Sequence, residues 1–400
     1  MNNILAILVL CFSTPVFSNF NFYKDLSLQP LDPVVMSGEI TKQIFSSKTW
    51  PTTVEISERN YVLNYSLNED LTNYIKKQLR RYGTDYTSVV VLDNNTGKVL
   101  SAIDYARKGR VFGKNLTFSS TNPAASIFKV ITAAELIENT KVDDKSLFTY
   151  SGKSSTLYKY QLKDRKNRWS RSIPFAKAFA RSNNVVFGKA AIKNTNVQGL
   201  TYMANRFGFN KDLPQLLDVG GSKLFQHYDS YSLAEMASGF NRETTISPFH
   251  GAVIASIVAN DGVLIKPSVI NSVTDQENDR VVWKSSYNID RVLSKDTASK
   301  MQTMMELTVK KGTARGAFRP WKTKRIKNIT IGGKTGSITG GVPYGKRDWF
   351  VSYAKPKNSD DAGISICIMI VNVNKWYIKS TVLAKDIIQY YYLKHHKKQG

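Results

Sequence analysis

Segments that favour β-strands lie near the two ends of this chain, and segments that favour helices fill the middle. Two early β-rich runs, 89–92 and 99–103, enclose the turn-forming residues 93–97 and therefore predict a hairpin. Three later strand-forming runs are separated by short loops, which is typical of strands that pair as antiparallel neighbours. The later runs are residues 329–338, 349–354 and 364–373.

The simplest fold that accommodates this order is of the α+β class, with one five-stranded antiparallel sheet flanked by terminal helices. Residues 68–82 and 380–393 are expected to form those helices, and Gly83 is expected to end the first. A further strand-forming segment spans residues 53–66. Residues 123–300 come between the early and the late strands, and we expect them to form an inserted all-helical lobe. A cleft between two lobes is a common place for a ligand site.

The N-terminal segment resembles a secretory signal peptide. Residues 4–12 form an apolar run, which is shorter than the ~20 residues that a membrane-spanning helix needs. Compact side chains follow, so we expect residues 1–18 to be removed by cleavage after Ser18. If they are retained, they would anchor the protein in the membrane. Residues 19–51 show no clear periodicity and are expected to form a poorly ordered arm. The main domain is then expected over residues 52–395, with a basic tail at 396–400.

The composition restricts the partners and cofactors that this chain can have. It contains 56 Lys and Arg but 31 Asp and Glu, a formal charge of +25, which favours anionic partners such as a membrane surface or a cell-wall polymer. No nucleic-acid-binding motif is present, so we expect no nucleic acid partner. Cleavage of the signal would leave one cysteine, Cys367, which excludes an intrachain disulfide. With 4 histidines, two of them adjacent, we expect neither a metal nor another cofactor.

Two Ser-x-x-Lys strings raise the question of a serine nucleophile. Ser126 and Lys129 lie in ASIFKVITAAELIE, whose apolar residues follow a helical period, whereas Ser352 and Lys355 lie at the end of an expected strand. Residues three apart share a face on a helix but point to opposite faces on a strand, so only the first pair can cooperate. A serine becomes a good nucleophile when a base takes its proton, and a lysine of lowered pKa can be that base. The alternative is a solvated serine and lysine on an ordinary helix.

Two further polar strings interrupt apolar segments. Ser182 and Asn184 lie in AFARSNNVVFGKAA, where a helix cap is the alternative to a site. In ITIGGKTGSITGG, Lys334, Thr335 and Ser337 stand on an otherwise apolar strand. Thr335 and Ser337 point to the same face and could hold a carboxylate, while Lys334 adds positive charge. The glycines around them would leave room for a ligand backbone along the strand, and a glycine-weakened edge strand is the alternative.

In this order, the three strings resemble the motifs of the penicillin-recognising serine acyltransferases, which comprise penicillin-binding protein transpeptidases and serine β-lactamases. The similarity extends to ISPFHGAVIASIVANDGVLIKP, KKGTARGAF and DWFVSYA, and it covers roughly residues 52–393. The chain is therefore identified as similar to a penicillin-binding protein transpeptidase domain.

The resemblance implies a role for each residue of the three strings. Ser126 would attack a carbonyl to form an acyl-enzyme, and Lys129 would accept its proton. Ser182 would pass a proton to the leaving amine, and Asn184 would hold the lysine and the substrate amide. The backbone N–H groups of Ser126 and Ser337 would form the oxyanion hole. The substrate-binding residues on the strand would be Lys334, Thr335, Gly336 and Ser337.

The implied substrate is a peptidoglycan stem peptide that ends in D-Ala-D-Ala, with β-lactam antibiotics as covalent inhibitors. A second stem would supply the acceptor amine in a transpeptidase, whereas water would replace it in a D,D-carboxypeptidase. A glycosyltransferase domain does not fit before residue 52, so such a partner would be a separate protein. A β-lactamase needs a group that activates water, and Glu235 and Glu243 lie in the right region without a supporting motif. A non-catalytic β-lactam sensor is the remaining alternative. In each case the protein is expected in the periplasm or cell envelope.

Overall fold

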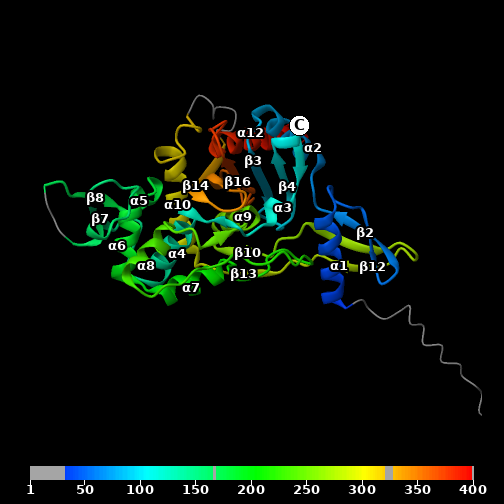
Figure 1. Ribbon diagram of the computed structural model, residues 1–400, viewed down its shortest axis with the longest axis horizontal. Coiled ribbons are helices and arrows are strands. Elements are labelled where there is room, and N and C mark those ends of the chain that lie inside the picture. The colour runs from blue at the N-terminus through cyan, green and yellow to red at the C-terminus, as the bar shows by residue number, and fades with distance from the viewer. Residues whose placement is uncertain (1–31, 165–167, 320–327, 399–400) are drawn as a thin grey trace, which may run out of the picture.

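The computed structural model describes residues 32–164, 168–319 and 328–398 (Figure 1). Its central element is a six-stranded antiparallel sheet. The strands are β3 (Tyr86–Asp93), β4 (Val99–Ala106), β5 (Val111–Gly113), β14 (Ile329–Gly340), β15 (Gly345–Pro356) and β16 (Ile364–Asn372). They follow the spatial order β14-β15-β16-β3-β4-β5, and every neighbouring pair is antiparallel. The α+β class and the five expected strands are confirmed, and the short strand β5 adds a sixth at one edge.

Helices cover both faces of this sheet (Figure 1). The terminal helices α2 (Glu69–Tyr82) and α12 (Ser380–Lys398) lie on one face, and α9 (Pro248–Ala259) packs on the other. Successive side chains of a strand point to opposite faces, so Ile366 of β16 joins the core under α12 while Cys367 joins the core under α9. Because both faces are covered, every residue of β16 is buried, which explains its continuous apolar sequence.

The ends of the two terminal helices follow from their capping residues. Asn68 begins α2 by accepting a hydrogen bond from the Leu71 N–H at 2.9 Å, and Gly83 ends it with a φ of +56°. The expected helix is therefore confirmed. Helix α12 continues to Lys398, past its expected end at residue 393 and into the expected basic tail, because no Gly or Pro stops it.

A second, four-stranded sheet includes the segment expected at residues 53–66. Its strands are β1 (Thr53–Ile56), β2 (Arg59–Tyr65), β11 (Ile270–Asp275) and β12 (Val281–Lys284), in that spatial order. The expected single strand is a hairpin, because Ser57 and Glu58 both adopt positive φ and reverse the chain between β1 and β2.

Helix α1 (Pro33–Ser46) packs against strand β1. The expectation of a poorly ordered arm is therefore wrong over these residues. Asp32 caps its start, and Met36, Ile40 and Ile44 recur every four residues to form a buried stripe. This apolar stripe is narrow, and its side chains are buried only because the second sheet covers them. The expected signal peptide lies outside the described residues. Within the described ranges, no helix combines the length and the apolar character needed to cross a bilayer.

The expectation of an all-helical lobe is wrong, because this region also contains short strands. These pair as β6 (Asn122–Pro123) with β9 (Thr245–Ile246), β7 (Leu147–Tyr150) with β8 (Arg171–Pro174), and β10 (Val263–Ile265) with β13 (Ile289–Arg291). Strands of two to four residues are too short to show a period, and their partners are distant in sequence. The remaining helical segments are η2 (Lys108–Arg110), α3 (Asn115–Phe118), η3 (Ala125–Phe128), α4 (Lys129–Asn139), η4 (Lys159–Leu162), α5 (Phe175–Ala180), α6 (Asn184–Asn194), α7 (Val197–Arg206), α8 (Ser230–Ser238) and α10 (Lys295–Lys311).

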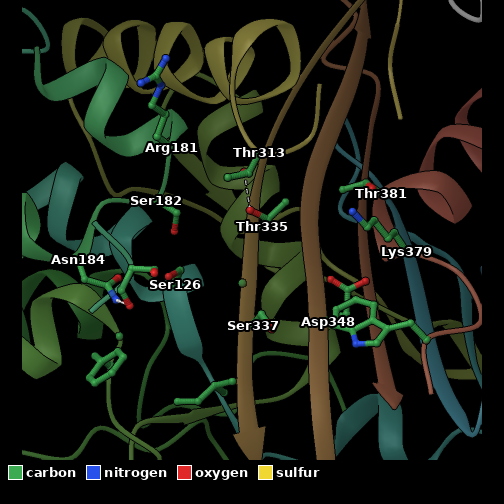
Figure 2. A pocket seen from close by; sticks show the side chains of 16 residues that line it. Ser126, Arg181, Ser182, Asn184, Thr313, Thr335, Ser337, Asp348, Lys379 and Thr381 are labelled. Atoms are coloured by element: carbon green, nitrogen blue, oxygen red, sulfur yellow. Dashed lines mark hydrogen bonds between the residues drawn. The ribbon is translucent and has the colours of Figure 1, made fainter. Parts of the chain in front are cut away.

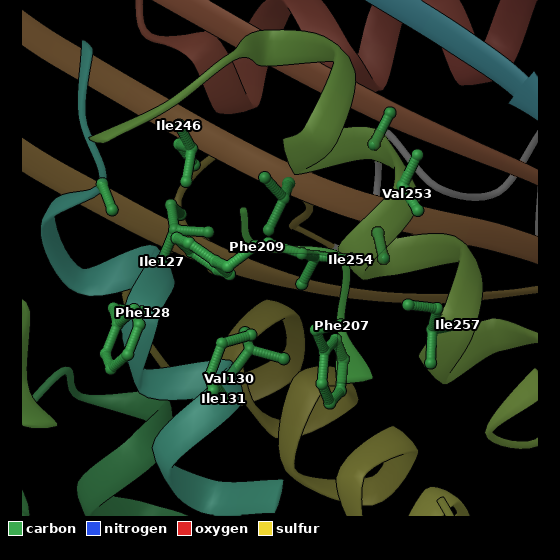
Figure 3. Packing of buried hydrophobic residues seen from close by; sticks show 14 of the residues in the cluster. Ile127, Phe128, Val130, Ile131, Phe207, Phe209, Ile246, Val253, Ile254 and Ile257 are labelled. Atoms are coloured by element: carbon green, nitrogen blue, oxygen red, sulfur yellow. The ribbon is translucent and has the colours of Figure 1, made fainter. Parts of the chain in front are cut away.

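The helical segment that carries Ser126 is anchored in the largest hydrophobic core. Ile127 and Phe128 of η3 and Val130 and Ile131 of α4 point into a cluster with side chains from α9 and from the segment after α7 (Figure 3). All four are fully buried. Large buried side chains hold a backbone in one position, so this core fixes the serine on a rigid support. Their partners in the cluster include Phe207, Phe209, Ile246, Val253, Ile254 and Ile257.

Candidate active site

Ser126 stands in a strained turn at the start of a helix. Ala125, immediately before it, has a φ of +50°, a conformation that costs a non-glycine residue about 1–2 kcal/mol. The turn continues through η3 into α4, so Ser126 and Lys129 are three residues apart on one helical path. The Lys129 Nζ lies 2.9 Å from the Ser126 Oγ, which confirms the predicted shared face.

Lys129 is completely buried among oxygen acceptors. Its Nζ donates to the Asn184 Oδ1 at 2.7 Å and to the backbone carbonyl of Ser238, in addition to its contact with Ser126. Burial lowers the pKa of Lys129 well below its usual range, and the positive charge of Lys334 lowers it further. The alternative of a solvated helix lysine is therefore wrong.

The loop between α5 and α6 places Ser182 and Asn184 toward the same site. Ser182 has a φ of +55°, and Asn183 caps α6 by accepting from the Val186 N–H at 3.1 Å. The helix cap that was the alternative to a site is therefore formed by Asn183, which lies between Ser182 and Asn184. This arrangement leaves Asn184 free to accept from Lys129, while its Nδ2 donates to the Ser155 carbonyl at 2.9 Å.

Strand β14 lies at the edge of the central sheet and brings Lys334 to Ser182. The buried Lys334 Nζ donates to the Ser182 Oγ at 2.9 Å and to the Thr335 carbonyl at 2.8 Å. Burial lowers the pKa of Lys334 to about 7. Thr335 shares a hydrogen bond of 2.6 Å with the hydroxyl of Thr313. Thr313 belongs to the string KKGTARGAF, which the sequence reading singled out without assigning it to the site.

The second Ser-x-x-Lys string does not form a comparable pair, as its strand position predicts. Ser352 is buried and donates weakly to the Ile366 carbonyl at 3.4 Å. Lys355 instead donates to the Gln302 Oε1 at 3.2 Å. These two side chains therefore stabilise the packing of β15 against its neighbours.

The glycines near Lys334 lie close to other parts of the protein, where a larger side chain would not fit. A Cβ on Gly332 would lie 2.4 Å from the Tyr353 ring, and a Cβ on Gly333 would lie 2.6 Å from the Phe350 ring. A Cβ on Gly336 would lie 3.2 Å from the Ile127 side chain. Gly336 also lines the cavity that contains Ser126, and the expectation that these glycines leave room for a ligand backbone stays a prediction. They let β14 approach the protein's own aromatic side chains and the segment that carries Ser126.

These residues surround one cavity of about 390 Å³ (Figure 2). Ser126, Ser182 and Asn184 lie on one side of it, and Thr335 and Ser337 lie on β14. Lys334 does not line the cavity itself but reaches Ser182, which does. Within the described part of the chain, no group of three or more His, Cys, Asp or Glu side chains could hold a metal ion. The sequence analysis did not assign the remaining lining residues to the site, although Arg181, Thr313, Ile338 and Asp348 lie in strings that it quoted. The others are Ser155, Gly239, Phe240, Trp376, Lys379 and Thr381.

Gly239 is a missed residue with a clear geometric requirement. It ends α8 with a φ of +62°, and a Cβ there would lie 1.8 Å from the Ala125 carbonyl oxygen. We expect Gly239→Ala to displace the turn before Ser126 and to lower the rate of covalent labelling by penicillin about 100-fold, because small misplacements of reacting groups are costly. The measurement is the labelling rate together with the thermal unfolding midpoint. Gly316→Ala is the matched control, since a Cβ there meets nothing within 4 Å. Equal labelling by both variants would contradict the requirement.

The fold and the arrangement of Ser126, Lys129 and Lys334 define the class of protein. Residues 87–389 match the family model described as the penicillin binding protein transpeptidase domain, and the chain belongs to this family. Among curated proteins it is similar to the peptidoglycan D,D-transpeptidase PbpA of Mycobacterium tuberculosis, with 24% identity over 322 residues. That match covers 72% of this chain and 62% of PbpA, so the chain spans less than two thirds of that relative.

Solved structures of two proteins share the fold. The D,D-transpeptidase domain of a peptidoglycan glycosyltransferase from Eggerthella lenta has a TM-score of 0.66 and 21% identity, over 88% of this chain and 87% of that one. Penicillin-binding protein A of M. tuberculosis, as an imipenem acyl-enzyme complex, has a TM-score of 0.61 and 18% identity, over 87% of this chain and 82% of that one.

Proposed function

We propose that this protein is a serine D,D-transpeptidase that acts on D-Ala-D-Ala stem peptides in peptidoglycan cross-linking. The observation that carries the proposal is the buried Lys129, which contacts both Ser126 and Asn184. These two residues line a cavity together with Thr335 and Ser337. The chain's membership of the transpeptidase family and its similarity to PbpA support the same activity. β-Lactams are expected to acylate the same serine. Penicillin-binding protein A of M. tuberculosis, which is similar to this chain, forms an acyl-enzyme complex with imipenem.

Acylation begins with the transfer of a proton to Lys129. A neutral amine has two N–H donors and one lone pair, and the three oxygens around Lys129 match that set. The two donors go to Asn184 and to the Ser238 carbonyl, which leaves the lone pair for the hydroxyl proton of Ser126. The Ser126 Oγ then attacks the carbonyl of the penultimate D-Ala. The backbone N–H groups of Ser126 and Ser337 stabilise the oxyanion, where losing one such donor costs about 3 kcal/mol.

The tetrahedral intermediate collapses when the leaving amine gains a proton. Ser182 supplies that proton, because its hydroxyl is held by Lys334 and faces the same cavity. The C–N bond breaks, D-Ala departs, and an ester to Ser126 remains. Thr335 and Thr313, joined by a hydrogen bond, bind the substrate's terminal carboxylate together with Ser337.

The alternative activities differ in what happens to the ester. A D,D-carboxypeptidase passes it to water, and a β-lactamase must activate water rapidly beside it. Neither Glu235 nor Glu243, the two candidates from the sequence, lines the cavity. This arrangement favours slow hydrolysis and hence a transpeptidase. A non-catalytic β-lactam sensor would form the ester without turning over stem peptides.

The lifetime of the penicilloyl ester separates these activities. We expect penicillin to stay attached for many minutes, while a D-Ala-D-Ala stem peptide is turned over with release of D-Ala. Intact-mass spectrometry over time measures the ester, and an assay of free D-Ala on the same preparation measures turnover. Loss of the adduct within about a second would indicate a β-lactamase. A lasting adduct without D-Ala release, even with an acceptor amine present, would indicate a sensor.

The same proposal places the protein in the cell envelope. Cleavage after Ser18 would release it on the outer side of the membrane, and retention of residues 1–18 would anchor it there. A separate glycosyltransferase would supply the glycan strands. The formal charge of +25 suits an anionic membrane surface or wall polymer.

A further inference from the structure

Two buried side chains of strand β15 contact the segment that leads to Ser126. Arg347 and Trp349 are two residues apart on the strand, so they point to the same face of the central sheet, and neither is exposed. The segment that they contact is strand β6, which consists of Asn122 and Pro123 and ends three residues before Ser126. The steps of ester formation give neither side chain a task.

Arg347 joins β6 to the turn between β14 and β15. Its Nε and Nη2 both donate to the Asn122 Oδ1, at 3.1 and 3.0 Å. Its Nη1 donates to the Gly345 carbonyl at 3.1 Å, and its Nη2 also donates to the Pro343 carbonyl at 2.6 Å. Among the described residues, no Asp or Glu oxygen lies within 4.0 Å of the guanidinium. All of these acceptors are therefore neutral.

A buried guanidinium without a carboxylate is a costly way to fill space. The desolvation of the charge lowers the pKa of Arg347 to about 10. An apolar side chain of similar length would occupy the same volume without that cost. The guanidinium adds direction instead, because its planar set of donors holds the Asn122 amide and the two turn carbonyls in a single arrangement.

Trp349 holds the other residue of β6. Its indole Nε1 donates to the Pro123 carbonyl at 3.1 Å. Pro123 leads into the strained turn in which Ala125 has a φ of +50°. A non-glycine residue keeps such a conformation only where its surroundings fix the backbone on both sides. The contacts to β6 therefore support the turn that presents Ser126.

The same stretch of β15 also fixes the second half of the proposed oxyanion hole. Asp348, which lies between Arg347 and Trp349, pairs with Ser337 in the antiparallel register of β14 and β15. The backbone N–H groups of Ser126 and Ser337 must both lie about 2.7–3.1 Å from the developing oxyanion. One N–H is thus held through the backbone of β15, and the other is held through its side chains.

We propose that Arg347 and Trp349 are positioning residues for the nucleophile, which set the place of Ser126 relative to Ser337 by holding β6. This inference rests on the proposed function, because it requires that Ser126 is acylated. Neither side chain lines the cavity. Both are therefore expected to change the rate of ester formation and to leave the binding of penicillin unchanged.

The test is the rate of penicillin labelling measured over a range of penicillin concentrations, which separates the limiting rate from the half-saturating concentration. We expect Arg347→Met to lower the limiting rate about 100-fold, because small misplacements of reacting groups are costly. Trp349→Phe keeps the ring and loses one hydrogen bond, so we expect a loss of about tenfold. The half-saturating concentration should stay within about twofold of the wild type in both variants.

Each variant has a matched control. Tyr353 lies on the same strand and face as Trp349, is also buried, and donates from its hydroxyl to the Gln302 carbonyl at 3.3 Å. Tyr353→Phe therefore loses one hydrogen bond that does not involve β6. Arg291→Met removes an arginine of β13 that also binds two backbone carbonyls. Both controls should label like the wild type at a temperature where thermal unfolding shows every variant to be folded.

A double variant tests whether Arg347 acts through Asn122. Asn122→Leu removes the acceptor of two of its hydrogen bonds and keeps a side chain of similar size. Arg347→Met combined with Asn122→Leu should label no more slowly than Arg347→Met alone, because both changes break the same contact. Losses that multiply in the double variant would overturn this path.

Limiting rates equal to that of the wild type in folded Arg347→Met and Trp349→Phe, even with lower unfolding midpoints, would overturn the positioning role. A change confined to the half-saturating concentration would overturn it as well. If Arg347→Met does not fold, Trp349→Phe and Tyr353→Phe decide the question by themselves. Failure of the proposed function looks different, because the wild type itself would then acquire no penicilloyl adduct at Ser126.

Discussion

Replacing Ser126 by alanine is expected to abolish covalent labelling by a fluorescent penicillin. The Ser126 Oγ lies 2.9 Å from the buried Lys129 Nζ and borders the cavity, so the proposed ester cannot form without it. Loss of a catalytic nucleophile lowers rates by at least about 1000-fold. Intact-mass analysis after exposure to penicillin measures the fraction of protein that carries the adduct.

Ser352→Ala is the matched control for that variant. Ser352 also begins a Ser-x-x-Lys string, but its side chain is buried in the sheet and hydrogen-bonds to the Ile366 carbonyl. Labelling should therefore persist in Ser352→Ala. An adduct that survives Ser126→Ala, or that disappears only with Ser352→Ala, would refute the assignment of the nucleophile.

Lys129→Arg is expected to stop acylation nearly as completely. Arginine keeps the positive charge but cannot be deprotonated usefully, because its pKa exceeds ~12. Lys129 is fully buried, so Lys129→Met, which has a similar length and no charge, is a companion that fits the space. Neither variant has a base beside Ser126, and we expect both to label at least about 1000-fold more slowly than the wild type. The labelling rate and the thermal unfolding midpoint are measured together.

Lys355→Arg, in the second Ser-x-x-Lys string, is the control and should label normally. Near-normal labelling of Lys129→Arg with an unchanged unfolding midpoint would refute the role of Lys129 as the base.

The pH dependence of labelling in the wild type is a further test, in which the direction of the change is predicted. Lys129 acts as a base only when neutral, so labelling should rise with pH as it loses its proton. Burial and the charge of Lys334 lower the pKa of Lys129, so this rise should be complete well below the ordinary lysine pKa of 10.5.

The sequence predicted the central sheet and the residues of the three strings because both depend on local patterns. Runs of strand-forming residues, turn residues and short loops are visible within ten or twenty residues, and they indicated strands β3, β4, β14, β15 and β16 correctly. The helical spacing of Ser126 and Lys129 is equally local. Six of the eight proposed site residues line one cavity, and the other two, Lys129 and Lys334, contact residues that line it. Their roles remain predictions.

Other features could not be predicted because they depend on partners distant in the chain. The stripe of Met36, Ile40 and Ile44 on α1 is buried because β1 lies beside it. The short strands of the lobe likewise pair with segments far away in sequence. Thr313 joins the site because β14 places Thr335 next to it. The glycines of β14 had a clear sequence signal, but only their neighbours show that they accommodate Tyr353, Phe350 and Ile127.

The sequence by itself determined that Ser126 and Lys129 share a helical face, because residues three apart on a helix always do. It did not determine that this lysine can act as a base. That property depends on the burial of its Nζ under Asn184 and the Ser238 carbonyl, with Lys334 close enough to act on it electrostatically. These groups come from segments up to about two hundred residues apart, and the pKa of a side chain responds to burial and charge in space. Only the tertiary structure could therefore decide the chemistry of Lys129.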